Sequence, residues 1–354
     1  MRKHKRIISL AILTLTFQWS GCSSEPEIVD EKTPDAITLV TSLNGAGDNG
    51  YNDLILSGAL KFYQEHEDVT LSLVWPHDMK EAESFLTSWM NKESEERQLL
   101  ILGGNEYEQI VREKGVTLNE WKTILLFESE AIPNVNTIRI QRYGVSYLAG
   151  CIVAPEGCAT IIAAMPNDPI LMDAISGFSD GFNKYYNEDD AEDSYYFSTG
   201  LDTIYLANDY TGYAMPDSTY RLVTEINNGF IYPLAGGSNN GIYKSIRDNH
   251  FALTMAIGMD ADCSAHGKSI PFSVIIRTDK LVEDYLTMWV DGETLPLHSS
   301  YGLEDGYADI VISPYFYDMN IQWKPYYEIE NYWEDAFHKY IGEAIEKERV
   351  YEER

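Results

Sequence analysis

Apolar and polar positions along the chain follow two alternating patterns. Short runs rich in β-branched residues recur, and between most of them apolar residues return at helical spacing, as Leu54, Gly58 and Phe62 do. Strands that alternate with helices indicate βαβ units and parallel sheets. Runs that are apolar throughout, such as 99–102 and 253–257, are typical of parallel strands buried on both faces. Strands are therefore expected at Ile37–Thr41, Val69–Trp75, Leu99–Leu102, Thr123–Phe127, Val135–Ile140, Thr160–Ala164, Thr203–Leu206, Phe230–Leu234, Leu253–Ile257 and Phe272–Ile276.

The length of the chain indicates more than one hydrophobic core. A chain of 354 residues exceeds what one core usually serves, which predicts two α/β lobes with parallel sheets flanked by helices. No Pro/Ser-rich linker divides the body into two independent pieces. The last stretch, Asn331–Arg354, carries Trp333, Phe337 and Ile341 on one face and is expected to form a terminal helix.

The N-terminal residues have the pattern of an export signal. A basic start is followed by the mostly apolar stretch Ile7–Phe17, which is too short to span a bilayer, and then by Ser20, Gly21 and Cys22. A cysteine at this place is typical of a lipidated bacterial precursor, with residues 1–21 as signal peptide and Cys22 as the acylated first residue. Residues 22–36 are rich in Ser, Glu, Pro and Asp and are expected to be a flexible tether. The alternative is an ordinary signal with a chance cysteine.

The net charge of the chain limits which partners it can bind. The chain holds 56 acidic and 26 basic residues, a formal charge of −30, so nucleic acid and anionic lipid headgroups would repel it. Attachment to a membrane would have to come from the lipid.

Cys151 and Cys158 are seven residues apart and could form a small disulfide loop or remain thiols, and both interpretations stay open. No Cys/His cluster suggests a metal, and no cofactor is expected. The acidic run Glu188–Asp193 lacks the glycine of a calcium loop and is expected to be a solvated loop.

Candidate ligand-binding residues follow the predicted strands, because open α/β sheets bind ligands beyond the carboxyl ends of their strands. After the first run, glycines permit a tight turn, and Asp48 can cap the next helix. Tyr51 and Asn52 would then face the crevice, as an aromatic ring and an amide suited to a heterocycle. A purely structural cap, with Tyr51 packed under a loop, is an equal alternative.

Two small-residue loops and one carboxylate lie at equivalent places. Asn105 follows Gly103-Gly104, and Gly236 and Gly237 follow Phe230–Leu234; neither loop is a Walker loop, and both would let a ligand approach the backbone. The apolar run Leu253–Ile257 delivers Asp260 into the crevice, where its carboxylate could accept hydrogen bonds from two vicinal hydroxyls such as those of a ribose. The alternatives for Asp260 are a solvated turn acid or, together with Asp262, half of a metal site.

Six motifs in sequence order resemble the basic membrane lipoprotein family, whose purine-nucleoside-binding (PnrA-like) members are type I periplasmic solute-binding proteins. The resemblance runs from about Ile37 to Ile312. Its motifs are Asp48-Asn49-Gly50-Tyr51-Asn52, Tyr147-Leu148-Ala149-Gly150, Gly177-Phe178-Ser179-Asp180-Gly181-Phe182, Ala235-Gly236-Gly237, Gly258-Met259-Asp260 and Gly302-Leu303-Glu304-Asp305-Gly306.

This resemblance implies roles for single residues. Tyr51 would stack on a base, Asn52 would contact its edge, and Asp260 would hold the ribose hydroxyls. The cleft lysine of the family falls near Arg277, and Asp209 with Tyr210 lies where a second polar or aromatic contact is expected. Three departures bear on the identity of the ligand: Tyr51 replaces Phe, Gly50 replaces Ser, and Glu128 stands where Asp is common.

The resemblance also implies a mechanism and an organisation. Residues 37–141 with 277–305 would form an N-terminal lobe, and 142–276 with 306–354 a C-terminal lobe, with crossings near Gln141, Arg277 and Asp305. Hinge closure would bury a small polar solute, most readily a purine nucleoside, and a monomer lipid-anchored on the periplasmic or outer face of a bacterial membrane would pass it to an ABC permease. The alternatives are a sensor that binds the solute without passing it on, or a binding protein for a sugar or other non-nucleoside ligand.

One motif suggests an enzyme. Gly177-Phe178-Ser179-Asp180-Gly181 fits Gly-x-Ser-x-Gly, but a nucleophile elbow needs a strand running directly into the serine. The residues before Ser179 have helical spacing instead, and nothing selects His266 or His298 as a partner. A hydrolase is therefore a distant alternative, and no catalytic residue is expected.

Overall fold

The structure is a computed structural model of the 354-residue chain, and it describes residues 35–43, 45–66, 68–114, 118–186, 200–226, 228–249, 253–314 and 332–353. The expected signal peptide, Cys22, nearly all of the tether and the acidic run Glu188–Asp193 lie outside the described residues. Within these ranges, no helix has both the length and the apolar composition needed to cross a bilayer.

The first lobe is built on a six-stranded sheet in which every neighbouring pair is parallel. Its strand order is β12-β5-β4-β3-β1-β2. The strands are β1 (Asp35–Val40), β2 (Val69–Val74), β3 (Gln98–Leu102), β4 (Lys122–Phe127), β5 (Asn136–Ile140) and β12 (His298–Tyr301). In register, Ile37 of β1 lies opposite Leu71 of β2 and Leu99 of β3.

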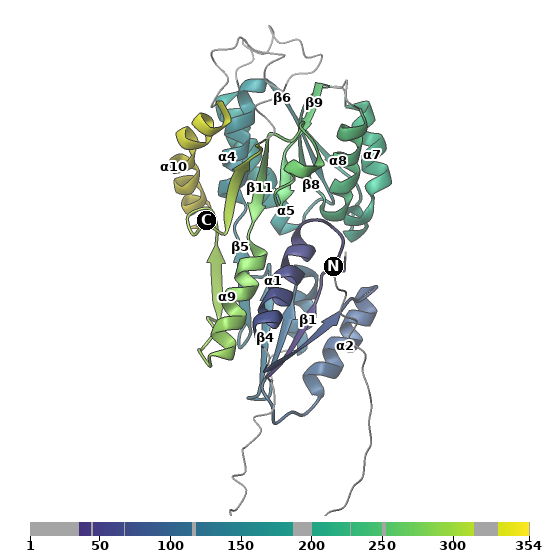
Figure 1. Ribbon diagram of the computed structural model, residues 1–354, viewed down its shortest axis with the longest axis vertical. Helices are drawn as coiled ribbons and strands as arrows, with labels where there is room; N and C mark the ends of the chain where they lie inside the picture. The colour runs from purple at the N-terminus through teal and green to yellow at the C-terminus, as the bar shows by residue number, and fades with distance from the viewer. Residues whose placement is uncertain are drawn as a thin grey trace, which may run out of the picture. The chain divides into compact units, whose positions relative to one another are not determined.

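Helices cover both faces of this sheet (Figure 1). One face packs against α2 (Met79–Asn91) and α3 (Glu108–Lys114), where Leu100 and Leu126 meet Leu86. The other packs against α1 (Tyr51–Glu65) and α9 (Thr278–Val290), which lie side by side. Burial on both faces explains why these strands are apolar throughout.

The second lobe contains two short sheets that meet. One has the order β7-β6-β8-β9 and the other β10-β11-β13. Only one residue, Ile257, separates β9 from β10, and its N–H donates to the Ile231 carbonyl of β8 (2.9 Å), which joins the sheets. The strands are β6 (Cys158–Ala163), β7 (Gly200–Tyr205), β8 (Asn228–Leu234), β9 (Leu253–Ala256), β10 (Gly258–Asp260), β11 (Phe272–Ile276) and the antiparallel β13 (Ala308–Ile312). Their helices are α4 (Tyr143–Val153), α5 (Pro169–Tyr185), α7 (Pro216–Glu225), α8 (Asn239–Asp248) and α10 (Tyr332–Glu352).

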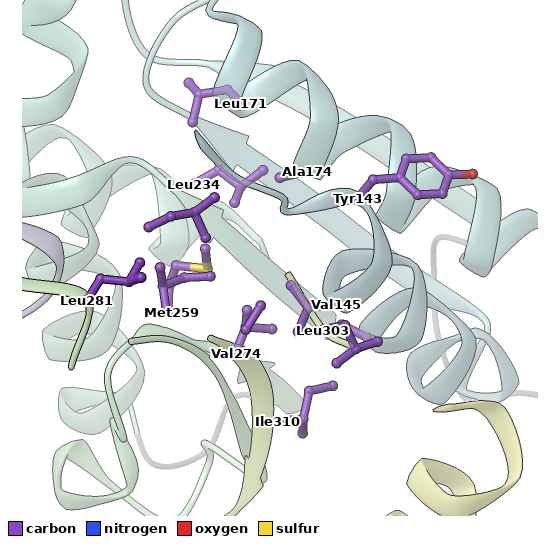
Figure 2. Close-up of a cluster of buried hydrophobic side chains, with 14 of the residues drawn as sticks. Tyr143, Val145, Leu171, Ala174, Leu234, Met259, Val274, Leu281, Leu303 and Ile310 are labelled. Carbon is purple, nitrogen blue, oxygen red and sulfur yellow. The ribbon is translucent and has the colours of Figure 1, made fainter. Parts of the chain in front are cut away.

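One buried hydrophobic cluster extends from the first lobe through the crossings into the second lobe. Figure 2 shows side chains from α4, α5, β8, β10, β11, α9 and β13 gathered in it, with Leu303 from the segment between β12 and β13. Leu234 of β8 and Met259 of β10 both belong to this cluster (Figure 2). These side chains fix the ends of the strands that carry the site.

The C-terminal helix is hydrogen-bonded to two of the segments in which the chain passes from one lobe to the other. Helix α10 packs along α4 (Figure 1), and the buried Glu348 carboxylate accepts the N–H of Gly144 (3.0 Å) and that of Leu303 (2.8 Å). A side chain at Gly144 or Gly302 would overlap this carboxylate, so Glu348 would have to shift from its two N–H donors to make room. Burial raises the pKa of Glu348 to about 7, although both N–H donors oppose the shift.

The structure confirms the α/β class, and each of the ten expected strands coincides with an observed one. The terminal helix is also confirmed, as α10. Three strands were not expected: β10, β12 and β13. The disulfide interpretation is wrong. Cys151 lies inside α4, and both it and Cys158 are buried thiols not joined to each other.

Candidate functional site

A pocket of about 690 Å³, partly open to solvent, lies between the two lobes. Its walls come from segments that follow the carboxyl ends of strands in both lobes, where ligands of open α/β sheets bind. The first lobe contributes Ser42, Asp48, Tyr51, Asn52, Gly103, Gly104, Asn105, Glu106 and Glu128. The crossing and the second lobe contribute Arg142, Asp168, Ile170, Leu171, Tyr210, Tyr213, Leu234, Ala235, Gly236, Met259 and Asp260.

The loop after β1 is organised by Asp48. Its carboxylate accepts the N–H groups of Gly50 (3.0 Å), Asn52 (3.0 Å) and Asp53 (3.2 Å), and also the side-chain amide of Asn52 (3.1 Å). These bonds satisfy donors in the first turn of α1. Burial raises the pKa of Asp48, an effect that the three N–H groups oppose. Asp48 thus acts as a cap for α1 as well as forming part of the wall.

Asn52 and Tyr51 differ in how their polar atoms are used. The Asn52 Oδ1 accepts the N–H of Ser42 (3.1 Å), so this amide ties α1 to the end of β1. The Tyr51 hydroxyl is buried and has no hydrogen-bond partner among the described residues. Because burial raises the pKa of Tyr51 well above its ordinary value, and nearby Glu128 adds to this, the hydroxyl keeps its proton.

Arg142 and Glu128 form a buried ion pair beside the Tyr51 ring. The Arg142 Nη2 donates to Glu128 Oε1 (2.6 Å) and Nη1 donates to the Ile140 carbonyl (3.1 Å), while the guanidinium carbon lies 5.9 Å from the Tyr51 ring centroid. Burial opposes the charge on Arg142, but Glu128 outweighs it and raises the pKa of the guanidinium. The second carboxylate oxygen of Glu128 is buried without a partner among the described residues.

Asp260 reaches α1 from the other lobe. It ends β10 with φ +68°, and its carboxyl group lies beside the backbone N–H of Tyr51, which favours its ionised form. Glycine at position 50 makes room, because a Cβ there would lie 3.1 Å from Asp260 Oδ2. Burial raises the pKa of Asp260 to about 7; Arg142 opposes the shift and Asp48 adds to it. At neutral pH this carboxyl can therefore serve as either a donor or an acceptor.

Two further acidic residues and two tyrosines line the rest of the pocket. Asp168 caps α5 through the N–H of Ile170 (2.9 Å) and accepts the Tyr213 hydroxyl (3.1 Å). Glu106, in a 3₁₀ turn (Asn105–Tyr107), accepts the N–H of Leu43 (2.8 Å), and burial raises its pKa. The rings of Tyr210 and Tyr213 stack with centroids 6.1 Å apart.

The pocket brings together seven of the ten ligand-binding residues expected from the sequence: Asp48, Tyr51, Asn52, Asn105, Tyr210, Gly236 and Asp260. The other three do not line it. Asp209 is exposed and caps the 3₁₀ turn Tyr210–Ala214 through the N–H of Thr211 (3.0 Å). Gly237 lies next to the lining residue Gly236. Arg277 is exposed at the start of α9, because β11 ends at Ile276 and the chain turns into the helix.

Six polar lining residues were not among the expected binding residues: Ser42, Glu106, Glu128, Arg142, Asp168 and Tyr213. The cation of this pocket is Arg142, not Arg277. Asp168 carried a recognisable signal, since Asp before Pro169 is typical of a helix start. Nothing local marked Arg142, which reaches the pocket because β5 ends at Ile140 and delivers it to the crossing.

The described residues include no group of three or more His, Cys, Asp or Glu side chains arranged to hold a metal ion. The motif serine, Ser179, lies within α5, so its hydroxyl is not presented on a strand-to-helix turn.

Comparison with known proteins gives structural similarity only. No family model matches the chain, and no curated protein sequence matches it. A solved ABC transporter system solute-binding protein from Aeropyrum pernix K1 is similar over 90% of both chains, with 18% identity and a TM-score of 0.68.

The fold is that of periplasmic solute-binding proteins. A carbohydrate transporter solute-binding protein from Agrobacterium radiobacter, solved with D-arabinose, is similar over 81% of this chain and 97% of its own (15% identity, TM-score 0.56). A transcriptional activator of the comK gene from Bacillus halodurans is similar over 87% and 97% (15% identity, TM-score 0.58).

Proposed function

We propose that this protein is the solute-binding component of an ABC-type transport system and performs no catalysis. The observation that carries this proposal is the pocket between the lobes. It combines buried acceptors and aromatic rings with two polar atoms, on Tyr51 and Glu128, that lack partners among the described residues. Buried polar groups cost free energy unless they are hydrogen-bonded, so a polar solute that reaches them would be stabilised there.

Closure of the lobes would trap the solute. The loop after β1 contacts the second lobe through the Tyr51 N–H and Asp260, and through Asn49 Nδ2, which donates to Asn240 Oδ1 (2.9 Å). Asn240 also donates to the Asp48 carbonyl (3.4 Å). These contacts link α1 of one lobe to α8 and β10 of the other. They would break on opening and reform on closing, as in hinge-type binding proteins.

The ligand proposed first is a purine nucleoside. The motifs shared with nucleoside-binding lipoproteins support it, since Tyr51 and Asp260 both line the pocket. Asp260 in its ionised form can accept two hydroxyl hydrogens of a ribose. A sugar is the alternative, because neighbours of this fold were solved with D-allose and D-arabinose.

We also propose that Cys22 carries the lipid anchor and holds the protein at the cell envelope. The export pattern of residues 1–21 supports this. A cognate permease gene beside the gene of this protein would favour transport over the sensor alternative, and a sensor kinase gene would favour sensing.

A thermal-shift screen tests the proposal. The protein, unfolded and refolded to release any bound ligand, is heated with nucleosides, free bases and simple sugars. A ligand at a hundredfold excess over its Kd stabilises the native state by about 2.7 kcal/mol, which shifts the melting temperature measurably.

The variant Asp260→Ala should abolish the shift caused by a nucleoside. Asp202→Asn, which removes an exposed carboxylate on β7, should preserve it. A shift by sugars alone would replace the nucleoside assignment, and the absence of any shift would contradict solute binding.

A further inference from the structure

The pocket wall carries far more negative than positive charge. Five carboxylates line it, from Asp48, Glu106, Glu128, Asp168 and Asp260. Among the described residues, Arg142 is the only Lys, Arg or His in the lining. A closed cleft excludes water, so charge that the protein leaves unbalanced there must be balanced by protons or by the ligand.

The positive charge of Arg142 is already paired with a carboxylate of the protein, that of Glu128. One of its terminal nitrogens donates to Glu128 and the other to the Ile140 carbonyl. Asp48, Asp168 and Glu106 each accept backbone N–H groups that belong to the fold. These bonds fix the carboxylates in place without supplying an opposite charge.

Two atoms in the wall mark where a ligand group belongs. Glu128 is 4% exposed, and its Oε2 has no partner among the described residues. The Tyr51 oxygen is buried and likewise has none, and both side chains adjoin Arg142. An anionic ligand placed there would face repulsion from the carboxylates, whereas a group with charged N–H donors could bond to both oxygens.

Resting on the proposed solute binding, and narrowing its nucleoside or sugar ligand to a positively charged derivative, we propose that the solute is a cation and that it places a protonated amine or similar N–H-bearing positive group against Glu128 Oε2 and the Tyr51 hydroxyl. Charge-assisted hydrogen bonds are about twice as strong as neutral ones, and those made to buried atoms are screened little. A cationic solute should therefore bind at least about tenfold more tightly than its neutral counterpart.

Matched pairs test the charge directly. Isothermal titration calorimetry at pH 6.5, where the amino sugars are mostly protonated, compares D-glucosamine with D-glucose, D-galactosamine with D-galactose, and 1-methyladenosine, which is also protonated at this pH, with adenosine. The expected result is that, in the pair that binds, the cationic member has a Kd at least about tenfold lower. A neutral member that binds as tightly or more tightly overturns the inference and leaves solute binding intact. If no member of any pair binds, both this inference and the proposed function fall.

Variants locate the charge effect. Glu128→Gln should reduce the preference for the cationic member to about threefold or less. Glu346→Gln removes the same charge from an exposed position on α10 and should leave the preference unchanged. Equal losses in both variants would assign the preference to the overall charge of −30 and overturn the inference.

Tyr51→Phe provides a second test that leaves the Arg142–Glu128 ion pair in place. It removes only the unpartnered oxygen, so it should weaken binding of the cationic member about three- to tenfold. Unchanged affinity would show that the positive group does not lie at this corner of the pocket.

Discussion

Replacing Glu348 with glutamine should make the stability of this protein less dependent on pH. Glu348 lies on α10 and accepts the N–H groups of Gly144 and Leu303, at two crossings between the lobes. Burial raises its pKa to about 7 from 4.5, and the nearby carboxylates of Glu352 and Asp305 add to the shift. The folded state therefore binds a proton more tightly at this site than the unfolded state does.

The sign and size of the effect follow from proton linkage. A carboxyl whose folded pKa is raised contributes stability that is present at low pH and is lost as the pH rises through the folded pKa. With values of about 7 folded and 4.5 unfolded, wild type gains about 2.5 kcal/mol from Glu348 between pH 8 and pH 5. The amide of the Glu348→Gln variant stays neutral at every pH and gains nothing. It also offers an acceptor to only one of the two N–H groups, which costs about 1–3 kcal/mol.

Urea unfolding followed by tryptophan fluorescence at pH 5, 6, 7 and 8 measures the difference between wild type and Glu348→Gln. Asp260, whose pKa is also raised to about 7 by burial, contributes equally to both proteins and cancels. The stability advantage of wild type should grow by about 2.5 kcal/mol as the pH falls from 8 to 5. Glu346→Gln, on the exposed face of α10, serves as control. An advantage that stays constant to within about 0.5 kcal/mol over this range would refute the reasoning.

Three further changes test the packing and the charges. Gly58→Ala should destabilise the protein by about 1–3 kcal/mol in urea unfolding, because its Cβ would overlap the backbone of α9. Gly342→Ala lies on α10, where no atom of the described residues is near the new methyl group, and it should stabilise the protein by about 0.5–1 kcal/mol. The reverse order of these two effects would contradict the packing of α1 on α9. Arg142→Met should lower the free energy of unfolding by about 3–5 kcal/mol, because it leaves Glu128 buried and unpaired. Adding Glu128→Gln should recover most of this stability. A loss below about 1 kcal/mol in Arg142→Met would mean that the ion pair is solvated. Burial raises the pKa of the Cys151 thiol to about 12, so it should resist iodoacetamide at pH 8 in the native protein and react after unfolding. Mass-spectrometric mapping of the labelled cysteines measures this. Rapid labelling of the native protein would contradict the burial of Cys151 in α4.

Local residue patterns were enough to predict most of the strands that build the sheets and the end of each sheet where the pocket forms. Apolar runs such as Leu99–Leu102 can be predicted because burial on both faces of a parallel strand leaves a local pattern. Asp260 could be placed for the same reason, since an apolar run leads directly to it. The turn of Gly45, Gly47 and Asp48 before α1 is likewise a local feature, and its left-handed residues match the expected tight turn.

Tertiary structure decided which charges meet. β10, β12 and β13 are three to five residues long, and partners distant in the sequence set their pairing, so no local period marked them. Arg142 and Arg277 hold the same local position, directly before α4 and α9, yet Arg142 is buried in the pocket wall and Arg277 is exposed. Asp48 and Asn52 satisfy backbone groups, while the Tyr51 hydroxyl and one Glu128 oxygen do not. The hydrogen-bonding state of a polar atom depends on what the other lobe brings beside it, and sequence periodicity carries no information about that contact.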